Sequence, residues 1–197
     1  MVAGLLLAGG AGRRMGTPKA LVRLHGEPLV VRAVRTLLAG GCSPVTVVLG
    51  ARAEDVTDAL LRAGLGPEVG AVVAEDWDEG MGASLRRGLD ALTHLPGLGA
   101  ALVHLVDLPG VTAEAVRRTT DGAGSASLRR AAYDGTPAHP VLLGRDHWSG
   151  VVGRAAGDSG ARDYLAGHPA LELVECGDVA APDDVDTPEQ LRRLAGI

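Results

Sequence analysis

Three cationic side chains follow a glycine-rich segment near the start of the sequence. The segment Gly9–Gly12 comes directly after an apolar run that ends at Ala8, and Arg13, Arg14 and Lys19 come next. Glycines let the backbone approach a ligand closely, with its N–H groups directed at anionic oxygens. Guanidinium and ammonium groups bind phosphate. We interpret the segment as a phosphate-binding loop, and the alternative is a tight turn with solvated cations.

Two familiar phosphate-binding motifs do not match this loop. The Walker-type loop requires a lysine directly after a glycine, and no lysine in the segment has that position. A dinucleotide-binding loop that begins at Gly10-x-Gly12 requires a third small residue, where Met15 stands and is too large for close packing of helix on strand. The sequence therefore favours a phosphate loop of another kind.

Two acidic positions are candidates for a metal site. Asp107 follows the apolar run Ala101–Val106, and its carboxylate either caps the next turn or holds a divalent cation. Mg²⁺ takes one or two carboxylates together with phosphate oxygens of the substrate. Asp186 precedes Thr187 and Pro188, a good helix start where an acid also favours the helix dipole. Spacing alone leaves open whether Asp186 reaches Asp107.

The histidines and cysteines give weaker signals. The six histidines stand singly, and Cys42 and Cys176 form no CxxC pair, so the sequence supports neither a zinc site nor a redox motif. His104 interrupts an apolar run, which favours a core histidine with its hydrogen bonds satisfied. His139 lies in the turn-forming stretch Thr136–Pro140, where it either meets a substrate or has a structural role.

Composition excludes several classes of function. The 197 residues suit a single domain, 1–197, with a substantial core. A net charge of −5 and an aromatic content of 2% argue against a nucleic-acid surface, which needs basic patches and stacking rings. No apolar run approaches the ~20 residues of a membrane span, and no signal-peptide pattern precedes the glycines. We therefore expect a cytoplasmic protein without nucleic-acid or membrane partners.

Alternating strands and helices must position these residues. The apolar runs predict six strands: Val2–Ala8, Val45–Leu49, Val69–Ala74, Ala100–Val106, Ser127–Tyr133 (more polar, near an edge) and Leu171–Cys176. The helical patterns begin at or near Pro28, Glu54, Gly82, Ala113, Ser159 and Pro188, and the stretch Gly135–Ser149 has no regular pattern.

This alternation predicts an α/β fold, a mainly parallel sheet covered by helices on both faces. In such sheets ligands bind beyond the carboxyl ends of the strands. The segments Gly9–Lys19 and Asp76–Ser84 and the residue Asp107 should therefore share one rim.

Six segments spread along nearly the whole chain carry a family resemblance. They are Leu7-Ala8-Gly9-Gly10-x-Gly12-x-Arg14-Met15-Gly16-x-x-Lys19, Trp77-x-x-Gly80-Met81-x-x-Ser84-Leu85, Asp107-x-Pro109, Gly135-x-Pro137-x-His139-Pro140-Val141, Gly157-Asp158-x-Gly160-Ala161-Arg162 and Asp184-Val185-Asp186-Thr187-Pro188-Glu189. In this order they resemble the MobA/MocA-like NTP-transferase family, the molybdenum cofactor cytidylyl- and guanylyltransferases.

The resemblance implies a three-layer Rossmann-like fold of the nucleotide-diphospho-sugar transferase type. It also implies Mg²⁺-dependent transfer of CMP or GMP from an NTP to the phosphate of a molybdopterin-type acceptor, with release of pyrophosphate and contact with a molybdoenzyme or cofactor chaperone. The implied nucleotide-binding residues are Leu7, Ala8, Gly9, Gly10, Gly12, Arg14, Lys19, Gly80 and Ser84. The implied catalytic residues are Arg14, Lys19 and Asp107, the metal ligands Asp107 and Asp186, and the acceptor-binding residues His139, Asp158 and Arg162.

The base and the acceptor stay open at this point. Ala8-Gly9-Gly10 resembles the guanylyl-transferring members, whereas Trp77–Leu85 and His139–Arg162 resemble the cytidylyl-transferring ones. One alternative function is transfer to another phosphorylated or acidic molecule, such as a sugar phosphate or a phospholactate-like acid. Another is a non-catalytic protein that binds a nucleotide or cofactor on the same fold.

Overall fold

The computed structural model describes residues 1–196 and is organised around a seven-stranded sheet in the order β5-β4-β1-β6-β8-β7-β9. The strands are β1 (Val2–Ala8), β4 (Val45–Leu49), β5 (Val69–Val73), β6 (Ala100–Leu105), β7 (Leu128–Tyr133), β8 (Thr136–Gly144) and β9 (Leu171–Glu175). Only β8 of these strands runs opposite to its neighbours, so the predicted mainly parallel α/β sheet is confirmed.

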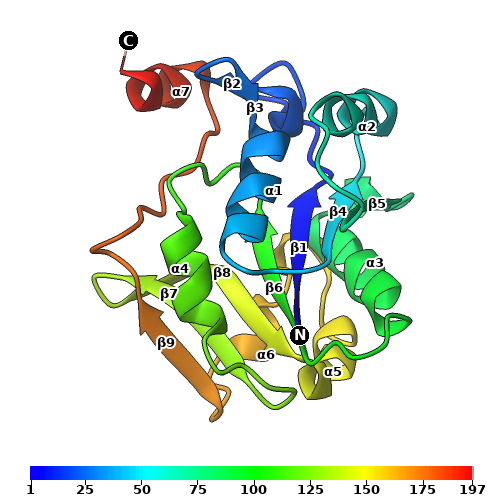
Figure 1. The fold of residues 1–197 in the computed structure, drawn as a ribbon, viewed down its shortest axis with the longest axis vertical. Helices are drawn as coiled ribbons and strands as arrows, with labels where there is room; N and C mark the ends of the chain where they lie inside the picture. The colour runs from blue at the N-terminus through cyan, green and yellow to red at the C-terminus, as the bar shows by residue number, and fades with distance from the viewer. Residues whose placement is uncertain (197) are drawn as a thin grey trace.

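Helices cover both faces of this sheet (Figure 1). On one face lie α1 (Leu29–Ala39) and α4 (Ala113–Thr120), and on the other lie α3 (Met81–Thr93), α5 (Trp148–Val152) and α6 (Arg162–Leu165). Successive side chains of β1 enter the two cores: Leu6 packs with the α1 side and Leu5 with the α3 side. The three-layer arrangement is therefore a consequence of strands that are apolar on both faces.

Three further elements lie at the edge where β1 ends (Figure 1). They are α2 (Ala53–Arg62), α7 (Pro188–Ala195) and a small hairpin of β2 (Arg23–Leu24) and β3 (Glu27–Pro28). None of the helices among residues 1–196 combines the length and the hydropathy that a bilayer crossing requires.

The expectation that Gly135–Ser149 is irregular was wrong, because most of this stretch forms β8 and the start of α5. Two prolines disfavour a central strand in the sequence pattern, since proline cannot donate to a sheet ladder. The structure accommodates them with a bulge: Ala132 pairs with Pro137 and Arg130 pairs with Val141, which leaves three residues opposite one. Strand β7 lies second from one edge of the sheet, between β8 and the edge strand β9, so its predicted position near an edge is confirmed.

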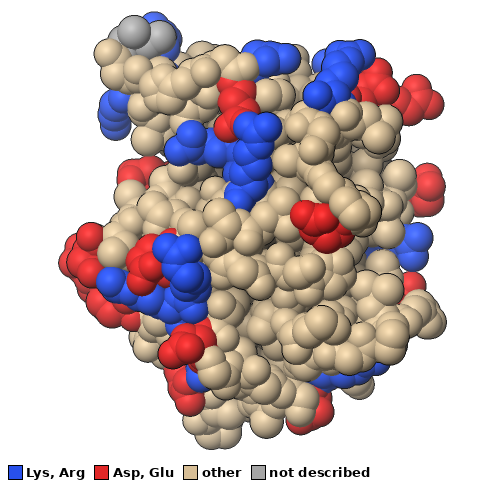
Figure 2. Space-filling view, in the orientation of Figure 1, with Lys and Arg blue, Asp and Glu red and all other residues tan. Residues whose placement is uncertain are grey.

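Charges on the face of α1 and α4 are mixed in sign. Figure 2 shows basic and acidic side chains side by side on this face. Over α4, Arg117 and Arg118 pair with Glu114, and Arg118 also pairs with Asp178 at 2.6 Å. Such paired charges are solvated surface features and form no basic patch on this face.

Candidate active site

Hydrogen bonds join the loops at the carboxyl ends of β1, β4 and β6. The N–H of Ala51, after β4, donates to the carbonyl of Gly9 at 3.0 Å. The N–H of Val106, after β6, donates to the carbonyl of Leu7 at 3.2 Å. The loops predicted to share one rim therefore lie together at one edge of the sheet.

The glycines of the first loop differ in their surroundings and in their backbone conformation. A Cβ on Gly9 would lie 3.1 Å from the hydroxyl of Ser84, so this backbone passes close to the start of α3. Gly12 has a φ of +59°, and a Cβ there would overlap the carbonyl group of Thr17. A Cβ on Gly10 would have no atom within 4 Å, so this glycine faces open space. Gly12 thus fixes the turn, while Gly9 and Gly10 keep its surface clear for a ligand.

Lys19 is the centre of the charged side chains at this rim. Its ammonium nitrogen lies 2.6 Å from Oδ2 of Asp107 and also contacts Oδ1 of Asp186. Burial lowers the pKa of Lys19, but the bonds to the two carboxylates outweigh burial and raise its pKa above the ordinary value. The lysine is therefore a fixed positive charge between two acids.

The chain folds so that Asp186 reaches Asp107. Val185 is fully buried, and its N–H donates to the carbonyl of Asp107 at 2.9 Å. The N–H of Asp186 donates to Oε1 of Gln190, and Thr187 and Gln190 form the capping box of α7. The capping interpretation therefore applies to the backbone around Asp186, while its carboxylate is left to face Lys19.

This pair of carboxylates fits a divalent cation. Since Asp107 and Asp186 bond to one ammonium group, their oxygens converge on a single point. No group of three or more metal-ligating side chains occurs within residues 1–196. A hard cation at this point would thus take two carboxylates and complete its coordination with phosphate oxygens and water, as Mg²⁺ and Mn²⁺ do.

A cleft of about 450 Å³ opens beside Lys19 and Asp107. Its lining residues are Leu7, Gly9, Gly10, Ala11, Arg13, Lys19, Trp77, Asp78, Gly80, Met81, Ser84, Leu105, Val106, Asp107 and Asp158. Most of the implied nucleotide-binding residues are among them, whereas Ala8, Gly12 and Arg14 are not.

Two residues of the cleft differ from the sequence expectations. Arg13 lines the cleft, while the side chain of Arg14 is 77% exposed and pairs with Asp186 at 3.3 Å. Asp158, expected on the acceptor side, lies in this first cleft beside Gly80, where a Cβ would come within 2.8 Å of its carboxylate. Adjacent arginines in a loop are equivalent in the sequence, and only the turn decides which one lines the cleft.

A second cavity of about 190 Å³ adjoins the first, since both are lined by Leu7, Met81 and Leu105. The implied acceptor-binding residues His139 and Arg162 lie in its wall. The complete lining is Leu7, Met81, Leu85, Val103, Leu105, Arg130, His139, Val141, Ser159, Gly160, Ala161, Arg162 and Leu165. Arg130 was missed in the sequence, where it is one of two adjacent arginines in a predicted strand.

Two buried histidines are uncharged: His139 in the wall of the second cavity, and His104 on the α1 side of the sheet. Burial is the main cause that lowers the pKa of His139 to about 4, and its Nδ1 lies 3.5 Å from the carbonyl oxygen of Val103. Burial likewise lowers the pKa of His104 to about 3. Nδ1 of His104 is buried without a hydrogen-bond partner, so the expectation of a satisfied core histidine was wrong.

Comparison with known proteins gives a family and several full-length relatives. The sequence profile of the MobA-like NTP transferase domain matches residues 4–173. The nicotine blue oxidoreductase of Paenarthrobacter nicotinovorans is 40% identical, over 98% of this chain and 96% of the relative. The molybdenum cofactor guanylyltransferase of Rhodobacter capsulatus is 29% identical, over 98% of this chain and 94% of the relative.

Solved structures share the whole fold. Rv0371c from Mycobacterium tuberculosis is 27% identical and superposes with a TM-score of 0.83, covering 100% of this chain and 97% of that chain. A manganese complex of Rv0371c superposes with a TM-score of 0.76 at 23% identity, covering 99% and 98% of the two chains. These similarities extend from β1 through α7 rather than over the loop alone.

Proposed function

The chain belongs to the MobA-like NTP transferase family, a family of nucleotidyltransferases, and we propose that it transfers CMP or GMP from an NTP to the phosphate of a molybdopterin-type acceptor. Pyrophosphate is the second product. The proposed cofactor is Mg²⁺, held by Asp107 and Asp186. The proposed setting is the cytoplasm, where NTPs are made, and a molybdoenzyme or cofactor chaperone would receive the product.

The contact of Lys19 with both carboxylates carries this proposal. A phosphate-binding loop alone is compatible with many functions, but here it faces two acids that converge on one point. A triphosphate brings the negative charge that Lys19 and Arg13 would neutralise, and a divalent cation held by Asp107 and Asp186 would supply further positive charge.

The geometry suits transfer between two phosphates. An oxygen of the acceptor phosphate attacks the α-phosphorus, the bond from that phosphorus to the bridging oxygen breaks, and pyrophosphate leaves with the bonding electrons. The acceptor is already an anion, so no general base is needed. The barrier then consists mainly of charge repulsion and positioning, which Lys19 and the glycine loop lower by holding the triphosphate in a fixed place.

The first experiment titrates ATP, GTP, CTP and UTP with Mg²⁺ or Mn²⁺ and records the melting temperature. We expect stabilisation by GTP or CTP, because the first-loop residues resemble one branch of the family and the later segments resemble the other. Release of pyrophosphate is then measured with molybdopterin, a sugar phosphate and a phospholactate-like acid as acceptors. Absence of pyrophosphate with every acceptor, despite nucleotide binding, would favour the non-catalytic alternative.

A second candidate is an oxidoreductase, because the relative at 40% identity carries that activity in its name. The two candidates differ in the small molecule that binds the first loop. NADPH oxidation in the presence of redox dyes, without pyrophosphate release from any NTP, would support the second candidate. Met15 at the third small position of a dinucleotide loop argues for the first.

A further inference from the structure

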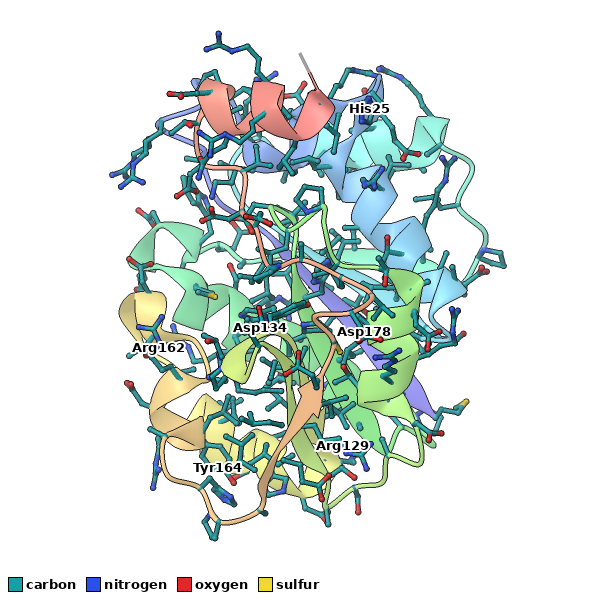
Figure 3. All side chains as sticks on the ribbon, turned by 90° about the vertical axis from the view of Figure 1, so that its left-hand side faces the viewer. His25, Arg129, Asp134, Arg162, Tyr164 and Asp178 are labelled. Carbon is teal, nitrogen blue, oxygen red and sulfur yellow. The ribbon has the colours of Figure 1, made fainter. Side chains whose placement is uncertain are left out.

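The second cavity has two guanidinium groups and no carboxylate in its lining. Arg130 comes from β7 and Arg162 from α6, and Figure 3 shows Arg162 on the face of the sheet that carries α3 and α6. Neither arginine forms an ion pair within the described residues 1–196, in contrast to Arg118 and Arg129, which both pair with acids. The wall of this cavity therefore has a local excess of positive charge.

The hydrogen bonds of Arg130 leave part of its guanidinium group available. Its Nε lies 3.4 Å from the carbonyl oxygen of Ala138, in the bulge of β8, and its Nη2 lies 3.2 Å from that of Pro137, the residue just before the bulge. Its Nη1 makes no hydrogen bond within the part of the chain that the structure describes. The bulge thus orients the guanidinium plane and leaves one N–H edge for a ligand.

The charge of Arg130 is poorly compensated. Burial, and then the nearby charge of Arg162, lower the pKa of Arg130 below its ordinary value. An anion between the two groups would relieve this repulsion and would accept bidentate hydrogen bonds from a planar guanidinium. His139 adds a neutral side chain to the same wall, so it does not repel such an anion.

The remaining wall limits what else can bind there. Leucine and valine side chains are prominent in it, and its volume is about 190 Å³. One anionic group and the few atoms around it would fill this space. The rest of a larger molecule would extend past Leu7, Met81 and Leu105 into the first cleft.

We propose that Arg130 and Arg162 bind an anionic group of the acceptor, a phosphate or a carboxylate, and that Arg130 selects acceptors that carry it. This inference rests on the proposed function, because only a transferase has an acceptor. The anion site itself depends on the residues of the cavity alone. Arg130 lies outside the six sequence motifs, so its proposed role in acceptor specificity comes from the structure.

The binding test uses phenyl phosphate, an anion on a small apolar body, with phenol as the neutral comparison. Calorimetric titration of the wild type should detect phenyl phosphate and not phenol. Arg130→Gln should weaken phenyl phosphate by about tenfold or more, the range expected for hydrogen bonds to charged groups. Arg130→Lys keeps the charge without the planar fork and should recover part of the affinity.

Arg129→Gln is the matched control. Arg129 is the neighbour of Arg130 in β7, but it lies on the opposite face, where it pairs with Glu172 at 3.0 Å and donates to the carbonyl of Asp121 (Figure 3). This variant should bind phenyl phosphate like the wild type. Equal affinity of Arg130→Gln and the wild type, or equal loss in both variants, would overturn the proposal. If Arg130→Gln fails to fold, Arg162→Gln and Arg130→Lys give the same comparison.

Kinetics separate this inference from the proposed function. In a working transfer assay, Arg130→Gln should raise KM for the acceptor and leave KM for the NTP unchanged, and a fall in kcat as well would identify the bound anion as the reacting phosphate. Active transfer with unchanged acceptor parameters would refute the inference alone. Binding of phenyl phosphate that depends on Arg130, without transfer from any NTP, would refute the proposed function and retain the anion site.

Discussion

The backbone N–H of Val185 donates a hydrogen bond of 2.9 Å to the carbonyl oxygen of Asp107. This bond joins the segment before α7 to the end of β6, and it is what places the next carboxylate, that of Asp186, beside Lys19. Val185 also anchors this segment by packing, since a fully buried valine stabilises the fold by roughly 1.5–3 kcal/mol. Two distant parts of the chain therefore form one charged site.

Replacing Asp107 by Ala should slow transfer strongly while the fold persists. The loss of a preorganised charge contact at a phosphate site costs about 10²–10³ in rate. Pyrophosphate release measures the effect, and circular dichroism checks the fold. Asp183→Ala is the control, because this exposed carboxylate lies outside the cleft lining. Turnover of Asp107→Ala at the wild-type rate would refute the metal-ligand role.

Replacing Lys19 by Met should have opposite effects on metal binding and on rate. Without nucleotide, the ammonium group stands between Asp107 and Asp186 and competes with a divalent cation. Its removal leaves two carboxylates that repel each other, so Mn²⁺ should bind more tightly to the variant, measured by calorimetry without nucleotide. The transfer rate should fall by about 10²–10³, because the charge facing the triphosphate is gone. Weaker Mn²⁺ binding by the variant would contradict the shared site.

Replacing Gly12 by Ala should damage the first loop and weaken nucleotide binding. The positive φ is unfavourable for alanine by about 1–2 kcal/mol, and the new methyl group would overlap the carbonyl of Thr17. Nucleotide titrations by thermal shift measure the loss. Gly124→Ala is the control, since Gly124 has no positive φ and a methyl group there would have nothing within 4 Å. Unchanged nucleotide affinity in Gly12→Ala would show that the turn is dispensable.

His104 should make the protein sensitive to acid. Its pKa is about 3 in the fold against an ordinary value of 6.5, so the unfolded chain binds the proton more readily and stability falls as pH drops below about 6.5. At about pH 5 the loss from this residue amounts to about 2 kcal/mol. In His104→Leu, which also removes the unpartnered Nδ1, urea unfolding should show a smaller difference between about pH 7 and about pH 5. The same difference in both proteins would contradict this assignment.

The rim of the site was predictable because its signals are local. A run of apolar residues followed by glycines, or by Asp107 and Pro109, identifies a strand end wherever it occurs. Parallel strand ends meet at one edge of a sheet, so the loop and Asp107 were expected together without any knowledge of strand order.

The predictions that were wrong or incomplete concern contacts between residues far apart in the sequence. The strand β8 was missed because Pro137 and Pro140 argue against a central strand, and only the bulge opposite Ala131 shows how the sheet accommodates them. Carbonyl groups at this bulge also orient Arg130, so the position of its guanidinium group could not be predicted from the sequence. Whether Asp186 reaches Asp107 was left open for the same reason, since the sequence pattern of a helix cap does not show which way the acidic side chain faces.

The attachment of Val185 to Asp107 also closes a long loop of the chain, which contains β7, β8 and β9. The two carboxylates therefore come together around Lys19 only once this loop has closed. Contacts between residues so far apart in sequence form late in folding, because the entropy of loop closure opposes them, so the charged rim belongs to the late events of folding.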